Sequence, residues 1–427
     1  MVSGPKLFSY KSSNQPNRRR QSNDANCLHP IWWDTGPALK EATEMNERVA
    51  IVGLGWAGFR PTTPDQSYKE LMYEAAVRAY SDAGVDPRRD IESYVTVAED
   101  FHEGTSIFDE YVPDQLGAAL KPVHTIGGDG LHGLAAATML VRSGLFDMVA
   151  VEGHSKASNI LTLPEVTAYA QDPVLNRPLH LNTHFVAGME MQRYLHETGT
   201  TREMCAAVVV KNRANALRNP SAPYGAELTL QEVLDGPPLA WPLGRREVAE
   251  HADGAVVLVL ASEDRARYLT DRPVWILGVG WCNESASLEG RDWAQGTYVR
   301  EAAGIAYRQA GIYNPQREID FAEVDDTYAY KELQALEALG LCRLGEAGEL
   351  TEAGATAADG DLPVNVSGGS LGMGNLLDAT GLARAVEAVL QLRGEAGPRQ
   401  LEDVEQGLVQ SWRGIPTTSG AVVILGN

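Results

Sequence analysis

Two short segments of this chain carry acids and a histidine in positions suited to general acid–base chemistry. Asp129 and His132 lie in the glycine-rich turn GGDGLHG, which leads into a segment of helical composition. Asp325 and Asp326 are adjacent acids at the end of the predicted strand in IDFAEVDD. Carboxylate and imidazole groups are the side chains that most often transfer protons in enzymes. These four residues are therefore the first candidates for a reactive site.

Each candidate also has a structural explanation. An aspartate at a helix N-terminus satisfies free backbone N–H groups and complements the helix dipole, so Asp129 is either a base or a helix cap. Neighbouring residues of a strand point to opposite faces, so we expect only one of Asp325 and Asp326 to face a common site. That carboxylate is either a general base with a raised pKa in an apolar pocket, or a group hydrogen-bonded to the backbone.

Further polar residues also have both a functional and a structural explanation. Asn375 ends the glycine-rich run SGGSLGMGN and either donates a hydrogen bond to an oxyanion or stabilises its own turn. Arg245 and Arg246, in RREVAEH, offer positive charge to an anionic ligand, although exposed arginines are common. His154 follows a predicted strand, and we expect it to be structural.

The composition excludes several classes of protein. The chain of 427 residues has 36 Lys and Arg against 57 Asp and Glu, a formal net charge of −21. Nucleic acids and anionic lipid surfaces are themselves negative, so neither is expected as the main partner. An anionic small molecule remains compatible, since it needs only a local positive field. Hydrophobic residues make up 44% of the chain, which is enough to bury a core.

The cysteines give no sign of a metal site or a disulfide framework. Cys27, Cys205, Cys282 and Cys342 are far apart and match no metal-binding or redox spacing. We therefore expect reduced thiols, no bound metal and a cytoplasmic protein, with Cys282 and Cys342 at a strand end or in the core. No segment reaches the roughly 18 consecutive apolar residues of a membrane helix, so no membrane span is expected.

Residues 1–46 differ from the rest of the chain. Their first twenty residues carry five basic side chains and no acid, and the segment is rich in Ser, Asn, Gln and Pro. Such a composition favours disorder, and we expect a flexible N-terminal extension with Met45 as the natural start. A basic leader or an arm that docks a partner through Trp32 and Trp33 is the alternative.

From Val49 onward the predicted elements occur twice in the same order. The first copy is predicted at 49–55 (strand), 67–84 (helix), 93–100 (strand), 123–133 (strand and turn), 133–144 (helix), 148–154 (strand) and 253–262 (strand); the second is predicted at 273–280, 297–311, 312–326, 364–374, 379–394, 408–414 and 419–427. A duplicated α/β unit explains the repetition. The expected halves are 47–270 and 271–427.

Two features of the halves concern the site. The helices after the glycine-rich turns are rich in Ala, Gly and Ser, which favours close packing between two sheets. Residues of about 155–245 have no counterpart in the second half and include the predicted helices 182–199 and 202–217. An insertion of this size is expected to carry substrate contacts or a dimer surface.

Four motifs of this chain resemble those of one family. They are DMVAVEGHSKAS (147–158), HADGAVVLVLAS (251–262), EVDDTYAYKELQALEALGLCRLGEAG (323–348) and VNVSGGSLGMGNLLDATG (364–381). In this order they resemble the thiolase superfamily, especially sterol-carrier-protein-type thiolases and their archaeal and bacterial relatives, over about residues 47–427. The resemblance implies two β-α-β-α-β-α-β-β halves that form a five-layered α-β-α-β-α fold, with a loop insertion in the first half.

The resemblance implies a coenzyme A thioester as substrate and no covalently bound cofactor. In the family, a cysteine at the N-terminus of a central helix accepts the acyl group, helped by a histidine and the helix dipole. Here Gly130 aligns with that cysteine, Asp325 and Asn375 align with two catalytic histidines, and the late Cys-x-Gly loop aligns within RGIPTTSG, which has no cysteine. A covalent acyl-cysteine mechanism is therefore not expected.

The same alignment assigns roles to other residues. It selects Asp325 over Asp326 for the site, and it favours a functional His132, which replaces a small residue at the catalytic turn. It places Gly130, Tyr328 and Gly369 in the substrate-binding region, with Tyr328 more suited to packing than to catalysis. Arg245 and Arg246 are the expected contacts for the phosphates of coenzyme A.

Two functions follow from the resemblance. The first is a subunit that makes or breaks a C–C bond in an acyl-CoA, by an acyl-transfer or retro-aldol reaction, without the cysteine. Retro-aldolases of this family lack it and pair with a small OB-fold zinc-ribbon protein, but their two tyrosines align with Asp325 and Asn375. The second is an inactive thiolase-fold subunit that supports an active thiolase. A homodimer or a heterodimer with another thiolase subunit is expected.

Overall fold

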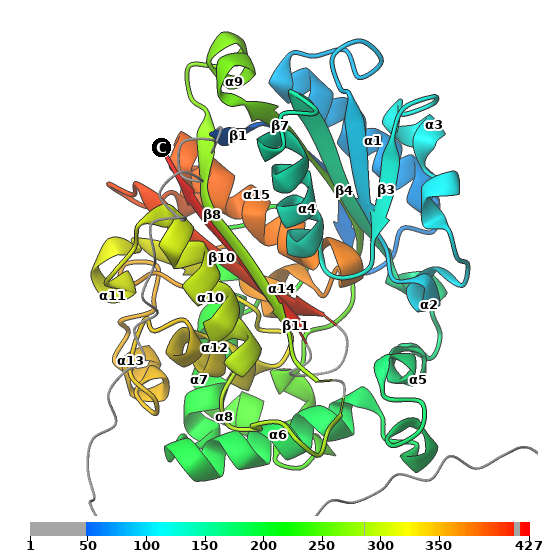
Figure 1. Ribbon diagram of the computed structural model, residues 1–427. Coiled ribbons are helices and arrows are strands. Elements are labelled where there is room, and N and C mark those ends of the chain that lie inside the picture. Colours follow the sequence, from blue (N-terminus) through cyan, green and yellow to red (C-terminus); the bar gives the residue numbers. More distant parts are fainter. Residues whose placement is uncertain (1–47, 286, 414–418) are drawn as a thin grey trace, which may run out of the picture. The chain divides into compact units, whose positions relative to one another are not determined.

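Two glycine-containing strands start the two copies of the fold. They are β1 (Val49–Arg60) and β8 (Val274–Asn283), which pair antiparallel over only two residue pairs, Ala50–Trp275 and Ile51–Val274. The computed structural model describes residues 48–285, 287–413 and 419–427, within the unit Glu47–Asn427 (Figure 1). The predicted extension 1–46, and with it Cys27, lies outside the described residues.

The elements follow the predicted order in both halves. The first half contains α1 (Tyr68–Ala83), β2 (Ser93–Val97), α2 (Asp100–Glu103), α3 (Pro113–Leu116), β3 (Val123–Ile126), α4 (Gly130–Arg142), β4 (Met148–Lys156), β7 (Asp253–Ser262) and α9 (Glu263–Leu269). The second half contains α10 (Thr297–Ala310), α11 (Pro315–Glu318), β9 (Phe321–Glu323), α12 (Ala329–Ala338), α13 (Ala347–Glu352), α14 (Gly369–Met373), α15 (Thr380–Arg393), β10 (Gln406–Arg413) and β11 (Ser419–Gly426).

The strand order repeats between the halves. In the described part of the chain, the large sheet runs β3-β2-β4-β7-β1-β8-β11-β10-β9. Within each half the strands lie in the order third, second, fourth, fifth, first, and the second strand pairs parallel with the third. The predicted strand at 364 is the exception, because it is reduced to one parallel bridge between Ala322 and Val364. This shared topology is what a duplicated α/β unit produces.

The layers are those of the five-layered α-β-α-β-α fold. Helices α4 and α15 contact each other and strands of both half-sheets, so they form the central layer (Figure 1). α1 packs on the other face of β1 and β7, and α10 on the other face of β8 and β11. Leu131 and Leu134 of α4 and Leu382 and Val386 of α15 belong to one buried apolar cluster with the inner faces of the strands. Their burial supplies much of the apolar area that stabilises the centre.

The insertion is mostly helical and packs on the second half. It contains α5 (Leu163–Thr167), α6 (Thr183–Thr198), α7 (Arg202–Ala216), α8 (Leu230–Leu234) and the short strands β5 (Pro238–Ala240) and β6 (Leu243–Gly244). α7 contacts α12, α13 and α14 of the other half. Asn182 and Thr201 begin α6 and α7 as side-chain caps, at the starts predicted from sequence.

Matched glycines allow the outer helices to approach the sheet. A Cβ atom on Gly55 of β1 would lie 2.2 Å from the Ala75 carbonyl oxygen of α1. A Cβ atom on Gly280 of β8 would lie 2.1 Å from the Ala302 carbonyl oxygen of α10. Real Cβ atoms do not approach an oxygen so closely, so only glycine permits this packing in either half.

We predict that Gly55→Val and Gly280→Val each reduce the free energy of unfolding by about 1–3 kcal/mol, because the added side chain pushes the outer helix from the sheet. Gly304→Ala is the control, since it replaces a glycine inside α10 where a Cβ atom meets nothing closer than 3.6 Å. This control variant should increase the free energy of unfolding by about 0.5–1 kcal/mol. Urea denaturation followed by circular dichroism measures all three, and unchanged stability of both valine variants contradicts the close packing.

Candidate active site

Asp129 caps both helices of the central layer. Its Oδ1 accepts from the Leu131 N–H at the start of α4, at 2.9 Å, and its Oδ2 accepts from the Gly381 N–H at the start of α15, also at 2.9 Å. Burial raises the pKa of this carboxyl to about 6, although the hydrogen bonds from Leu131 and Gly381 and the charge of Arg384 act against the rise. Both oxygens are thus engaged, as in the cap explanation of Asp129.

The position aligned with the nucleophile has no room for a side chain. A Cβ atom on Gly130 would lie 2.6 Å from Cγ of Leu382 and 2.7 Å from its backbone nitrogen. Leu382 of α15 therefore occupies the space beside the N-terminus of α4. The close contact of the two central helices depends on glycine at this position.

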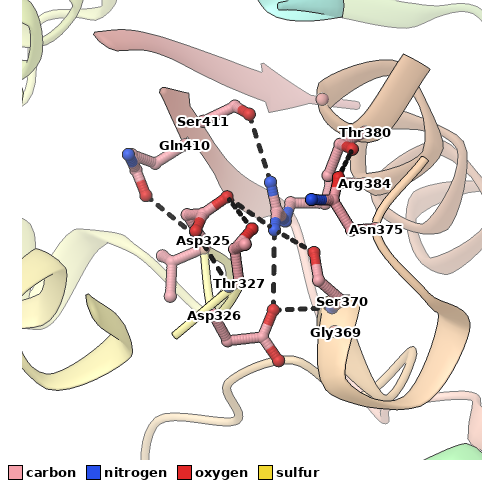
Figure 2. A network of polar contacts seen from close by, with 12 residues as sticks. Asp325, Asp326, Thr327, Gly369, Ser370, Asn375, Thr380, Arg384, Gln410 and Ser411 are labelled. Carbon is pink, nitrogen blue, oxygen red and sulfur yellow. Dashed lines mark hydrogen bonds and ion pairs between the residues drawn. The ribbon is translucent and has the colours of Figure 1, made fainter. Parts of the chain in front are cut away.

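A buried arginine of α15 holds both acids of the Asp325-Asp326 pair (Figure 2). Nη2 of Arg384 lies 2.9 Å from Oδ2 of Asp325 and 3.5 Å from Oδ1 of Asp326. Both acids lie beyond the end of β9 and so both reach this arginine, although only Asp325 also lines the cavity. The carboxylates raise the pKa of the Arg384 guanidinium against the effect of its burial.

Asp325 is also bound to its own turn. Its Oδ1 accepts from the Thr327 N–H at 2.9 Å, and its Oδ2 accepts from the Thr327 hydroxyl at 3.3 Å. Its backbone N–H donates to Oε1 of Gln410 at 2.9 Å (Figure 2). The surroundings of this carboxylate are therefore polar and charged, unlike the apolar pocket that the sequence analysis considered for it.

Asp326 points away from the cavity and fixes α14. Its carboxylate accepts from the backbone N–H groups of Ser370 and Leu371, at 2.6 and 3.1 Å, and from Nδ2 of Asn212 at 2.9 Å. Burial raises its pKa to about 6. Gly369 is buried against this carboxylate, since a Cβ atom there would lie 2.1 Å from Oδ2 of Asp326. Gly369 therefore serves this packing and does not line the cavity.

A cavity opens where β2, β3, β9 and β10 end. Its empty volume is about 780 Å³ including the open mouth. The lining residues come from eight segments: Glu99 and His102; Gly128 and Asp129; Leu163, Pro164 and Thr167; Thr183 and His184; Val248, Ala249 and His251; Asp325, Thr327 and Tyr328; Asn375, Leu377, Asp378 and Thr380; and Trp412 and Arg413. The ends of strands are where α/β folds commonly bind ligands. The insertion supplies one wall through α5 and α6.

Asn375 presents a hydrogen-bond donor in this cavity. Its Oδ1 accepts from the Leu377 N–H at 3.0 Å and from the Thr380 hydroxyl at 3.3 Å. Its Nδ2 has no hydrogen-bond partner among the described residues. The side chain thus stabilises its own turn through Oδ1, and its amide donor has no partner in the described structure.

His132 lies beside the cavity and does not line it. Its Nδ1 accepts from the Asp129 N–H at 3.3 Å, which leaves the ring proton on Nε2, a buried atom without a partner in the described structure. Burial, and next the charge of Arg413, lower its pKa to about 4. His132 is therefore neutral near pH 7.

Three other predicted residues have different surroundings. Tyr328 lines the cavity, and its hydroxyl lies 3.3 Å from Nδ1 of His184. Arg245 and Arg246 lie outside the cavity wall: Arg245 pairs with Glu250 at 2.9 Å, and Arg246 donates to the Glu232 carbonyl at 2.9 Å. Both arginines are exposed, on the segment that leads to Val248 and His251 of the wall.

The cavity also contains histidines that the sequence analysis did not select. His102 lies with its Nδ1 3.0 Å from Oδ1 of Asp378, and His184 and His251 stand on other walls. The available signals were the position of His102 just after a predicted strand and that of Asp378 in the DATG segment. Neither residue belongs to a glycine-rich turn, where many of the predicted site residues lie.

No described cysteine reaches the cavity. Cys205 and Cys342 are buried, and burial raises the pKa of the Cys342 thiol to about 12. Cys282 is near the end of β8, as expected. Among the described residues, no three His, Cys, Asp or Glu side chains are grouped as a metal would require. Within those residues, no helix is both long and apolar enough to cross a membrane.

Known proteins match nearly the whole chain. An acetyl-CoA acetyltransferase of Methanothermobacter thermautotrophicus is 32% identical over 379 residues, which are 87% of this chain and 97% of the relative. The chain belongs to the thiolase superfamily. A profile described as thiolase C-terminal domain-like matches residues 281–427. Bovine sterol carrier protein 2 is 30% identical over 403 residues, 89% of this chain and 72% of that protein, so the relationship is to the sterol-carrier-protein type.

A solved structure of the superfamily has the same fold. The Ltp2-ChsH2(DUF35) aldolase superposes with a TM-score of 0.77 at 27% identity, and the match covers 89% of this chain and 97% of that one. The five-layered fold of this thiolase-superfamily member is thereby confirmed. The family includes at least one aldolase of closely similar structure.

We predict that His132→Leu flattens the pH dependence of stability. The pKa of His132 is about 4 in the folded state and about 6.5 when unfolded, so its contribution is complete above pH 6.5 and is lost as the pH falls through 4. Between pH 6.5 and pH 4 the free energy of unfolding of wild type should therefore fall by about 3 kcal/mol more than that of H132L. Urea denaturation at several pH values measures the difference. His196 is exposed, so His196→Leu should show the same pH dependence of stability as wild type. The same pH dependence in H132L and wild type would contradict a buried neutral His132.

We predict that Arg384→Met reduces the free energy of unfolding by about 3–5 kcal/mol, because two carboxylates stay buried without their cation. Arg393→Met on the same helix is the control. Arg393 pairs at 2.8 Å with Asp82, which is 36% exposed and stays hydrated when its partner is removed. The triple variant R384M/D325N/D326N should recover part of the loss. Equal losses in R384M and R393M, measured by urea denaturation, contradict the role of Arg384.

Proposed function

We propose that this thiolase-superfamily member binds an acyl-CoA thioester in the cavity and makes or breaks the C–C bond beside it by retro-aldol chemistry, without a cysteine nucleophile. The observation that carries the proposal is the amide donor of Asn375 in a cavity that no described thiol reaches. The filled space beside Gly130 adds to it, because the central helix cannot present an acyl acceptor there.

The reaction needs a donor and proton transfer but no covalent intermediate. A base takes the proton of the 3-hydroxyl group, and the C–C bond breaks to give a carbonyl compound. The electron pair of that bond forms a thioester enolate, whose oxygen accepts from Nδ2 of Asn375. A proton then reaches the α-carbon and yields the shorter acyl-CoA. The reverse sequence forms the bond.

The likeness to known proteins supports the substrate class. The Methanothermobacter relative is named for acetyl-CoA, and the solved relative is an aldolase. The net charge of −21 requires a local positive field for the phosphates of coenzyme A. Arg245 and Arg246 stay candidates for these phosphates, since they are exposed on the segment that leads to His251 of the cavity wall.

Assembly is part of the proposal. We expect a homodimer or a pairing with a second thiolase subunit, as the family resemblance implies. A small OB-fold zinc-ribbon partner is supported by the solved relative, whose name joins Ltp2 with ChsH2(DUF35) in one aldolase. Native mass measurement of the endogenous complex tests both forms of assembly.

One observation favours a second candidate, an inactive subunit that supports an active thiolase. Asp129 and Asp325, two of the acids expected to react, are committed to helix caps and to the pair with Arg384. If the chain were inactive, the cavity would be a remnant and these contacts would serve the fold alone. Turnover that appears only after addition of a cysteine-bearing thiolase would support this candidate.

We predict that the purified protein cleaves a member of a panel of 3-hydroxyacyl-CoA thioesters, and that Asn375→Ala lowers kcat by about 100-fold or more, because one oxyanion donor is lost. Asn375→Asp is the matched variant: its carboxylate still accepts from Leu377 but offers no donor to the thioester. Product analysis by mass spectrometry measures turnover. Full activity of both variants contradicts the role of Asn375, and release of free coenzyme A with acyl transfer contradicts the retro-aldol reaction.

A further inference from the structure

We propose that His102, oriented by Asp378, is the catalytic residue that transfers the proton at the α-carbon of the thioester. This inference deepens the proposed function and rests on it. It assigns the base and acid that the aligned positions do not supply, since Asp129, Asp325 and His132 are engaged or turned away from the cavity.

The His102–Asp378 contact has the geometry of an oriented base. Nδ1 of His102 lies 3.0 Å from Oδ1 of Asp378, so the carboxylate holds the ring proton on Nδ1 and leaves Nε2 for the substrate. Nε2 has no hydrogen-bond partner among the described residues, and the side chain is 11% exposed, at the cavity wall. Asp378 is held in turn, because its Oδ2 accepts from the Glu99 N–H at 2.8 Å.

The other cavity histidines lack this arrangement. Burial, and next the charge of Arg245, lower the pKa of His184 to about 4, and its Nδ1 already contacts Tyr328. Burial also lowers the pKa of His251, whose Nδ1 has no partner in the described structure. For His102 burial acts in the same direction, but Asp378 together with Glu99 and Glu103 outweighs burial, so the pKa is raised. His102 is thus the cavity histidine whose carboxylate partner favours the bound proton while its Nε2 stays available to a substrate.

One turn holds the donor for the thioester oxygen and the carboxylate that positions His102. Asn375 is fixed through Leu377 and Thr380, and Asp378 lies between these two residues. The donor for the thioester oxygen and the carboxylate that orients His102 therefore belong to residues 375–380. A thioester presents its oxygen and its α-carbon on adjacent carbons, so two groups fixed by one short turn suit enolisation at that position.

The segment that carries His102 is anchored from its other side. Glu103, the next residue of α2, lies 3.0 Å from Nε2 of buried His154, whose Nδ1 is 3.1 Å from Glu152 of β4. The two carboxylates raise the pKa of His154 well above its usual value, although its burial acts against them. The resulting charged group ties Glu103, the last residue of α2, to the sheet.

Exchange of the α-protons of product thioesters in D₂O tests the inference. Acetyl-CoA and propionyl-CoA are the probes, since an enzyme that protonates the thioester enolate must also remove that proton in the reverse direction. In each event His102 accepts one α-proton and returns a deuteron from solvent, with no other reactant. We expect exchange by wild type and a loss of about 100-fold or more in His102→Gln, with an unchanged Kd for coenzyme A.

The outcomes separate the inference from the function on which it rests. Exposed His196→Gln is the control and should exchange as wild type. Unimpaired exchange in H102Q, or a loss in His251→Gln alone, overturns the role of His102 and leaves the proposed function standing. No exchange by wild type with either thioester overturns both. A folded H102Q is recognised by its circular dichroism and thermal midpoint.

Asp378→Asn tests the positioning residue through the pH profile. The exchange rate requires neutral His102 and so rises with pH through the pKa of that ring. Because Asp378 raises this pKa, D378N should move the rise to lower pH. The other charged groups that face His102 are Glu99, Glu103 and His251, and they remain in the variant. A lower rate with an unshifted profile shows that Asp378 is only structural and overturns its role.

Discussion

The charge of one buried arginine organises this fold around its centre. Arg384 lies inside α15, where its guanidinium is removed from water, so the structure must supply anions and acceptors for it. Asp325 and Asp326 from the end of β9, Ser370 of α14 and Ser411 of β10 meet this need. The same contacts fix the start of α14 and the turn after β9, and that turn forms part of the cavity wall. An acid at the aligned catalytic position has thereby become the partner of a buried cation.

The packing of the two central helices leaves no room for a side chain at Gly130, where the alignment predicts the nucleophile position of the family. α4 and α15 share a single cap, Asp129, and approach each other closely enough that Leu382 fills the space beside Gly130. A thiol at that position would need these helices to separate. The close contact between α4 and α15 is therefore incompatible with a reactive cysteine at this position of the chain. The polar groups that remain available to a substrate lie on the wall of the cavity, at the 375–380 turn and on α2.

The halves and the site differ in how well the sequence predicted them. The repeated strand, helix and glycine patterns predicted the long elements. Gly55 and Gly280 each pack closely against a helix, so both copies need a glycine at this position, and the sequence shows it. The predicted strand at 364 was wrong because one bridge replaces the ladder there. His102 and Asp378 were missed, because they are 276 residues apart and meet only through the fold. Local spacing thus predicts elements well and pairs of distant side chains poorly.

The sequence by itself determined the duplicated architecture and the relationship to the thiolase superfamily, and it predicted that no cysteine stands at the aligned catalytic positions. These properties depend on residue type and on local spacing, which a sequence displays directly. Only the tertiary structure decided what each polar group does. Whether a carboxylate is a base, a cap or a counter-ion depends on which N–H groups and which cations surround it. Those neighbours, Gly381 for Asp129 and Arg384 for Asp325, come from a helix far along the chain.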